Sequence, residues 1–200
     1  MPEIPDTPST SWNPDDVTVS WSQPIFNGDE ITSYTILFRT SDYGVYKEEK
    51  TNCDGSNPII RNANSCTIPV SILKAAPFSL PWGADITVKI IATNTKGDSD
   101  ESNPGSGAII TTIPDKPINL VEDIKYRTSS TLGLSWDDGL DNGGDVIYDY
   151  RIYLKQVGGA YSLLVSGVVN KYYTATQLTF GITYVFKVQA RNSYGYSLDS

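Results

Sequence analysis

The sequence predicts an all-β protein built from two antiparallel β-sandwiches in tandem. Apolar and polar residues alternate with period two along short stretches, as in strands that bury one face. Helical periodicity is nearly absent over the 200 residues. The same pattern of hydrophobic anchors also occurs twice, and a copy length near 100 residues with about seven short strands is typical of a β-sandwich.

Each copy begins its pattern with a strand that ends in tryptophan. Residues 17–21 read VTVSW, and residues 132–136, 115 positions later, read LGLSW. Two aliphatic residues and the tryptophan share one face, so we expect Trp21 and Trp136 in the two cores. An Asn-Gly turn sequence follows each strand at the same offset.

Two later strands of each copy also align. We expect the tyrosines of the first of them, Tyr34 and Tyr150, in the cores. The second aligns at an offset of 98, so the first copy holds 17 extra residues (115 − 98 = 17) in its middle. The matched positions are Ile31, Tyr34, Ile36 and Phe38 with Ile147, Tyr150, Ile152 and Leu154, and then Ile86, Val88, Ile90, Ala92 and Asn94 with Tyr184, Phe186, Val188, Ala190 and Asn192.

Only one segment favours helix. Residues 70–76 lie between Pro69 and Pro77, which limits them to one or two helical turns.

The repeated motif resembles the fibronectin type III family. Residues 178–197 carry it in full as Leu-x-x-Gly-x-x-Tyr-x-Phe-x-Val-x-Ala-x-Asn-x-x-Gly-x-Ser. Residues 80–99 carry it too, with Ile86 at the position of the family's tyrosine. The resemblance implies immunoglobulin-like sandwiches of seven strands, and a core Tyr184 whose hydroxyl bonds to backbone a few residues upstream. It says little about function, because this fold hosts many binding roles.

The domain boundaries follow from the repeat. We expect domain one at residues 1–113 and domain two at residues 114–200. Because the chain ends five residues after Gly195, domain two is expected to lack its last strand and to leave residues 184–192 with unpaired backbone groups. The covering strand would come from residues beyond Ser200 or from a neighbouring copy, with the segment before Trp12 as a candidate donor.

The two cysteines, Cys53 and Cys66, lie in the extra segment of domain one. Turn residues near both ends and an apolar middle suit a hairpin or a stapled loop. A disulfide there would stabilise the fold by about 3 kcal/mol and would place the protein in an oxidising compartment. The alternatives are a metal ligand or a reactive thiol, but with no histidine and no further cysteine a zinc site lacks soft ligands.

Composition argues against several functional classes. The net charge of −8 disfavours nucleic acid and anionic lipid as partners. No apolar run reaches the roughly 20 residues of a membrane helix, so we expect no membrane insertion. The sequence contains no histidine and no phosphate-binding glycine motif. We therefore expect no catalytic residue, cofactor or resident metal.

Three groups of residues are candidates for binding. Lys96, Gly97 and Asp98 form a turn that resembles integrin-binding loops of the family, although it is also the family's ordinary turn. Four acids could hold calcium through oxygen ligands, or could simply be a solvated loop. Exposed aromatics could form a sugar platform or a protein contact, or Trp82 and the matching Phe180 could cap the sandwich ends. The acids are Asp137, Asp138, Asp141 and Asp145, and the aromatics are Trp12, Trp82, Tyr172, Tyr173, Tyr194 and Tyr196.

These observations favour an extracellular or cell-surface structural or adhesive module. It would be a link in a tandem array or surface filament, with protein partners that include copies of itself. The alternatives are a receptor ectodomain for a soluble ligand and an accessory carbohydrate-binding module of a secreted enzyme.

Overall fold

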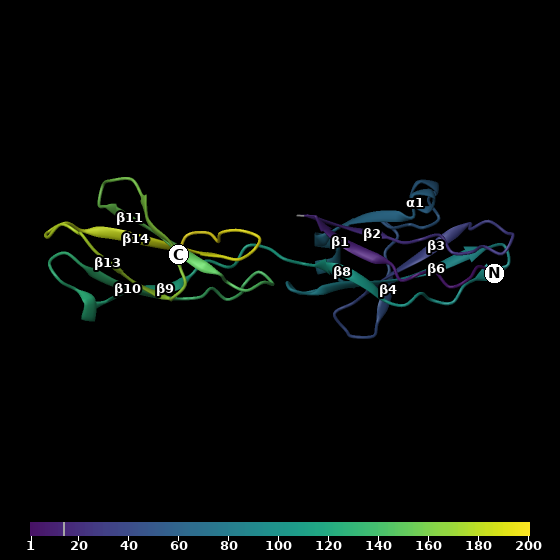
Figure 1. The fold of residues 1–200 in the computed structure, drawn as a ribbon, viewed down its shortest axis with the longest axis horizontal. Helices are drawn as coiled ribbons and strands as arrows, with labels where there is room; N and C mark the ends of the chain where they lie inside the picture. Colours follow the sequence, from purple (N-terminus) through teal and green to yellow (C-terminus); the bar gives the residue numbers. More distant parts are fainter. Residues whose placement is uncertain (14) are drawn as a thin grey trace. The chain divides into compact units, whose positions relative to one another are not determined.

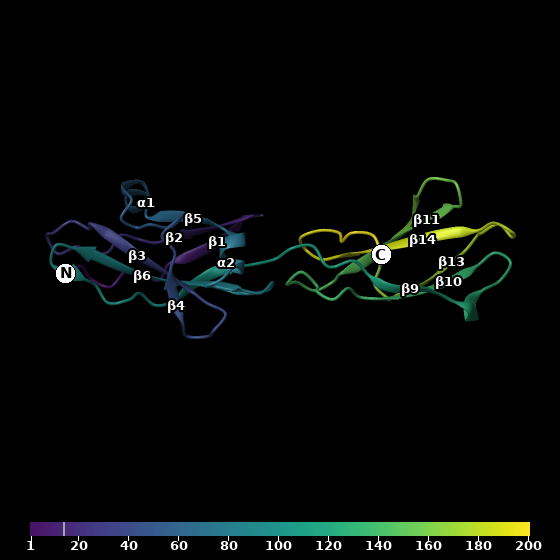
Figure 2. The ribbon, with the colours of Figure 1, turned by 180° about the vertical axis from the view of Figure 1, so that it is seen from behind.

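A computed structural model describes residues 1–13 and 15–200 of the chain (Figures 1 and 2). They fall into two compact units, Met1–Ile110 (unit 1) and Thr111–Ser200 (unit 2). Both are β-sandwiches of the predicted class. The predicted boundary between residues 113 and 114 lies three residues beyond this division and stays a prediction.

Unit 1 packs two sheets around one core. Every second side chain in two of its segments is buried in this core, which explains why these segments form half-buried strands. The buried residues are Val17, Val19, Trp21, Tyr34, Ile36 and Phe38. One sheet has the order β1-β2-β5. The other has the order β4-β3-β6-β7, and β8 also pairs with β6. The strands are β1 (Ser9–Asn13), β2 (Asp16–Ser20), β5 (Ser65–Pro69), β4 (Tyr46–Glu48), β3 (Ser33–Arg39), β6 (Asp85–Asn94), β7 (Gly97–Asp98) and β8 (Gly105–Ile109).

The N-terminal segment is docked on unit 1. Pro2, Pro5 and Pro8 are all buried, and the Glu3 N–H donates to the Ile25 carbonyl at 2.9 Å. Strand β1 then pairs with β2 along its whole length. The expectation that the segment before Trp12 is free to donate a strand to a neighbouring copy is therefore wrong, because its backbone and its prolines are already used within unit 1.

The extra segment of unit 1 contains a short helix rather than the hairpin that was one of its two predicted forms. Helix α1 (Pro58–Ala63) starts where the Asn57 side chain accepts a hydrogen bond from the Ile59 N–H at 3.0 Å. Asn64, in the left-handed conformation, ends it. A second helix, α2 (Val70–Lys74), lies within the segment predicted to be helical and buries Val70 and Leu73.

Unit 2 repeats this plan with six strands. Its sheets have the orders β13-β10-β9 and β12-β11-β14, and Figures 1 and 2 show β11 beside β14. Their antiparallel register places Tyr150 opposite Ala190 and Ile152 opposite Val188, all four of which are buried. The elements are β9 (Ile118–Asp123), the 3-10 helix η1 (Ile124–Tyr126), β10 (Leu132–Asp137), β11 (Asp149–Gln156), β12 (Ser162–Val168), β13 (Tyr172–Ala175) and β14 (Tyr184–Arg191).

The edge of β14 is covered along half its length. The Ser197 N–H donates to the Ala190 carbonyl at 2.8 Å, and the Ser200 N–H donates to the Val188 carbonyl at 3.0 Å. The prediction of unpaired groups over the whole of residues 184–192 is thus wrong for this half. Within described residues 111–200, no strand of unit 2 corresponds to β8, which in unit 1 pairs with Asp85, Ile86 and Val88.

The predicted core aromatics form one matched pair in each unit. Trp21 and Tyr34 meet edge to face with their ring centroids 5.3 Å apart, and Trp136 and Tyr150 do the same at 5.3 Å. All four are buried. Tyr184, also predicted in the core, is only half-buried, because no described strand covers this end of β14.

Candidate interaction surfaces

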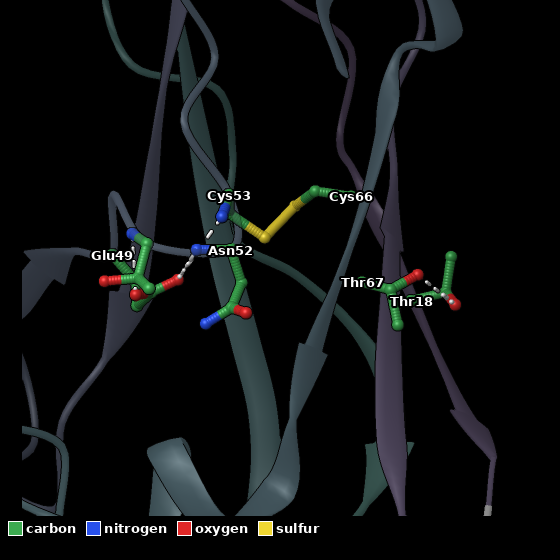
Figure 3. The surroundings of a disulfide bond; sticks show 7 residues. Thr18, Glu49, Asn52, Cys53, Cys66 and Thr67 are labelled. Atoms are coloured by element: carbon green, nitrogen blue, oxygen red, sulfur yellow. Dashed lines mark hydrogen bonds between the residues drawn. A yellow bond between two sulfur atoms is a disulfide. The ribbon is translucent and has the colours of Figure 1, made fainter. Parts of the chain in front are cut away.

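The disulfide links the loop after β4 to strand β5. Cys53 and Cys66 are joined with their Cα atoms 5.3 Å apart, and both side chains are buried in unit 1 (Figure 3). A buried bond of this kind acts as a structural crosslink, since neither sulfur is exposed for chemistry.

The Glu49 carboxylate stabilises the turn that positions Cys53 for the disulfide. It accepts the backbone N–H groups of Thr51 at 2.9 Å, Asn52 at 2.9 Å and Cys53 at 3.3 Å (Figure 3). Burial raises the pKa of Glu49, but the hydrogen bonds from Asn52 and Thr51 outweigh it, so the net pKa lies below its ordinary value. This role of Glu49 was not predicted from the sequence.

The predicted loop at Lys96, Gly97 and Asp98 is exposed. The Lys96 N–H donates to the Asn94 side chain at 2.9 Å, and Asp98 accepts the Thr93 hydroxyl at 2.7 Å. Gly97 has a φ of 116°, which a residue with a side chain rarely adopts. These contacts build a tight turn, and binding through it stays a prediction.

The four acids proposed for calcium are engaged separately. Asp137 accepts the Asn119 amide at 2.9 Å, and Asp138 bonds to Tyr150 and to Lys171. Asp141 caps the Gly143 N–H at 2.7 Å. Among residues 1–13 and 15–200, no three acidic or cysteine side chains are placed to hold a metal ion. Calcium binding there stays a prediction.

Asp145 is held by its own loop and by the turn after β14. It accepts the N–H of Ser193 at 3.1 Å, the N–H of Val146 at 2.8 Å and the Tyr148 hydroxyl at 3.1 Å. Hydrogen bonding to Ser193, and then to Val146 and Tyr148, lowers the pKa of Asp145. The carboxylate therefore ties two loops of unit 2 together.

The predicted aromatics lie in different environments. Trp12 and Trp82 are half-buried against the core of unit 1, and the Lys74 ammonium lies 3.6 Å from the Trp82 ring centroid. Phe180, at the matching position of unit 2, is 83% exposed. The expectation that it caps its sandwich as Trp82 does is wrong, because described residues 111–200 form no helix that corresponds to α2.

The outer face of the β12-β11-β14 sheet carries an alternation of cations and tyrosines. The Arg151 guanidinium lies 3.6 Å from the ring centroid of Tyr196 and 5.4 Å from that of Tyr153. The Lys187 ammonium lies 4.9 Å from Tyr153 and 4.4 Å from Tyr161. We call this set the cation–tyrosine ladder; its members are Arg151, Tyr153, Lys155, Tyr161, Lys187, Arg191 and Tyr196.

Cross-strand register builds the ladder. Tyr153 lies opposite Lys187 in the β11–β14 pair, and residues directly opposite share a face. The sequence signal was the polar alternation R-x-Y-x-K in residues 151–155 and K-x-Q-x-R in residues 187–191. Those are the outward positions of strands predicted from the sequence, but Tyr196 alone among the ladder's members was a predicted binding residue.

A groove of about 280 Å³ lies beside the uncovered end of β14. Its apolar lining comes from Leu120, Leu132, Leu134 and Phe186, with Tyr184 at its side.

In the part of the chain that the structure describes, no helix combines the length and apolar character needed to cross a membrane.

The chain matches known proteins in sequence and in fold. The fibronectin type III domain model matches residues 119–200. Protein sidekick-1 of Gallus gallus is 32% identical over 119 residues, which is 56% of this chain and 5% of sidekick-1. Fibronectin type-III domain-containing protein 3A of Pongo abelii is 25% identical over 186 residues, 88% of this chain and 14% of that protein. The chain therefore spans a small fraction of the relatives' length.

A solved structure of the chicken CNTN1 FN1-FN3 domains superposes with a TM-score of 0.51 at 22% identity. The match covers 100% of this chain and 64% of that one, and it shows a shared fold. Sidekick and CNTN1 are cell-surface proteins, whereas fibronectin type-III domain-containing protein 3A is intracellular.

Proposed function

The chain is a tandem pair of fibronectin type III domains, and we propose that it serves as a non-catalytic link in an extracellular array or filament that works through protein contacts. Domains of this family are typically non-catalytic. The observation that carries the proposal is the cation–tyrosine ladder, an outer sheet face that joins charge with large amphipathic rings. Tyrosine and arginine are the side chains that protein interfaces favour.

The ladder supports a protein partner better than a sugar. Carbohydrates stack on free aromatic faces, whereas here Arg151 lies over Tyr196 and Lys187 lies between Tyr153 and Tyr161. Cations therefore lie against these tyrosine rings, and cations pair with the carboxylates of a protein partner. This favours a structural or adhesive module over an accessory carbohydrate-binding module.

The disulfide supports a location outside the cell. Cys53 and Cys66 are bonded and buried, and such bonds persist in oxidising compartments but are rare in the cytosol. The relatives include both cell-surface and intracellular proteins, and the bond favours the cell-surface alternative.

The test uses the native protein on its source cells. Intact cells are treated with a membrane-impermeant label and with a reagent that joins lysine amines to carboxylates, and peptides are mapped without reduction. We expect labelled protein, a bonded Cys53–Cys66 peptide, and a cross-link from Lys155 to another polypeptide. Lys155→Arg keeps the charge but removes the amine, so that cross-link should disappear.

Either part of the proposal can fail by itself. Free thiols at Cys53 and Cys66 together with absent labelling would overturn the extracellular location. Labelled protein whose ladder lysines form no cross-link to another polypeptide would overturn the proposed protein contact.

A further inference from the structure

We propose that the cation–tyrosine ladder of unit 2 binds the acidic unit 1 of a second copy of this chain. The inference rests on the proposed function and names the partner in its protein contact. It is carried by the charge of the two units and by the pairing of the ladder's cations.

Charge is divided unevenly between the units. Unit 1 holds 14 acidic and 7 basic residues, which is a net charge of −7 (7 − 14). Unit 2 holds 9 acidic and 8 basic residues, a net charge of −1 (8 − 9). Nearly all of the chain's −8 thus lies on unit 1, and four of the cations of unit 2 are gathered in the ladder.

Two of these four cations are neutralised internally. Arg191 pairs with Asp149, and Lys187 lies 2.8 Å from Asp199, so both cations of β14 have carboxylate partners. Arg151 and Lys155, on β11, differ: within residues 1–13 and 15–200, no ion pair joins either to a carboxylate. Their unmatched charge is what an acidic partner would compensate.

These two cations have a defined spacing. Arg151 and Lys155 are four residues apart on one strand face, which places their backbone positions about 13 Å from each other. Two exposed apolar side chains share that face, since Leu163 pairs opposite Tyr153 and Val185 opposite Lys155. They are 53% and 36% exposed. The face therefore has an apolar centre beside unmatched cations, as interfaces do.

A contact between unlike faces has a consequence for assembly. Unit 1 of one copy would bind unit 2 of the next, which is a heterologous contact that extends into open chains unless the rotation closes a ring. Such a contact suits a link in an array. Because the attraction is ionic at an exposed face, it should weaken as salt screens it.

The test is sedimentation velocity of the whole 200-residue chain over a range of protein concentrations. At about 0.03 M salt, where screening is weak, we expect reversible self-association. At about 0.3 M salt we expect the association constant to fall roughly tenfold or more. The double variant Arg151→Glu/Lys155→Glu should abolish self-association at low salt.

The matched control is Lys116→Glu/Lys125→Glu. It makes the same change in net charge on unit 2 at exposed residues outside the ladder, and it should associate nearly as the parent does. Circular dichroism checks that each variant is folded. If the glutamate variant unfolds, Arg151→Gln/Lys155→Gln removes the two charges more gently and should still weaken association about tenfold, the scale of losing a short-range ion pair.

Three results would overturn the inference. One is a chain that stays monomeric at low salt and high concentration. Another is equal association of ladder and control variants. The third is a monomer whose ladder variants change only its sedimentation coefficient, which would indicate a contact within one chain. The proposed function would still hold after any of these results if Lys155 cross-links to a different polypeptide on cells. Failure of the self-association can therefore be distinguished from failure of the proposed protein contact.

Discussion

Glu49 is the clearest case of one side chain holding a local structure. Its two oxygens accept three successive N–H groups, from Thr51 to Cys53, and its side chain is buried. Replacement by glutamine would leave an N–H group facing an amide donor. We expect Glu49→Gln to destabilise unit 1 by about 1–3 kcal/mol. Chemical unfolding would measure this loss.

The same residue predicts a pH dependence. The folded-state pKa of Glu49 is lowered, so its contribution is fully present above the ordinary glutamate pKa and is lost as pH falls through the folded value. The stability difference between parent and Glu49→Gln should therefore shrink on acidification. Glu48→Gln is the control, since the ion-pair partner of Glu48 is Lys50, whose side chain is 70% exposed, and should cost under about 0.5 kcal/mol. A constant difference from neutral to acid pH would contradict this role.

Tyr184 provides a second prediction for a single residue. Its hydroxyl accepts the Thr179 N–H at 3.0 Å, five residues upstream, as the family resemblance implies. We expect Tyr184→Phe to lower the stability of unit 2 by about 1 kcal/mol, the net value of one such bond. Tyr172→Phe is the control, because Tyr172 is 62% exposed. Equal melting of both variants would show that the Tyr184 bond has no effect on stability.

These two residues show what single positions reveal. Tyr184 could be predicted because a spaced motif carries it, and the motif implies its hydrogen bond. Glu49 could not, because its three donors converge only once the turn before Cys53 has formed. Its acidic neighbour Glu48 looks the same in the sequence.

At the scale of elements, the segment after the long last strand is tied back by two serines in both units. The Ser99 and Ser102 side chains accept the N–H groups of Ala92 and Ile90, each at 3.0 Å. In unit 2, Ser197 and Ser200 accept those of Ala190 at 2.9 Å and Val188 at 3.0 Å. Ser197 and Ser200 lie 98 positions after Ser99 and Ser102, the same offset as that of the long strands in the repeat. In each unit the two serine hydroxyls thus accept N–H groups along the edge of the long strand, β6 in unit 1 and β14 in unit 2.

This arrangement predicts equal effects in the two units. Ser99 and Ser197 are buried, so replacing either with alanine would leave a buried strand N–H unpaired. We expect Ser99→Ala and Ser197→Ala each to cost about 1–3 kcal/mol in their own unit. Unfolding of the two variants, with exposed Ser129→Ala as the reference, measures this. If Ser197→Ala melts like Ser129→Ala, the tie in unit 2 is not formed in solution.

The cation–tyrosine ladder shows why a site formed by several paired strands is hard to predict from the sequence. Period-two alternation predicted that Tyr150, Ile152 and Leu154 face inward, which leaves Arg151, Tyr153 and Lys155 outside. It did not predict which residue of β14 stands opposite each. Lys187 meets Tyr153 and Tyr161 only in the observed register, and a slip by one residue would turn it to the other face.

At the scale of the whole molecule, the two units differ in what holds them together. The buried core cluster of unit 1 has 20 residues and includes the disulfide, Phe78 and Leu73 from the extra segment. The cluster of unit 2 has six. The repeat in the sequence predicted two similar folds, but not this difference, because a residue aligned to a core position is buried only if the neighbouring elements cover it. Phe186 aligns with the fully buried Val88 and is half-buried.

Separate cores predict separate unfolding. No residue is shared between the two clusters, so calorimetry of the chain should show two transitions, with unit 2 melting first because it buries less apolar surface. Trp136 lies in the core of unit 2, 3% exposed, and Trp136→Ala should cost about 3–5 kcal/mol there. The lower transition should move down or vanish while the upper one stays in place. Trp21→Ala, the matching change in unit 1, should shift the upper transition instead. A single transition that both variants move together would show that the units unfold as one cooperative body.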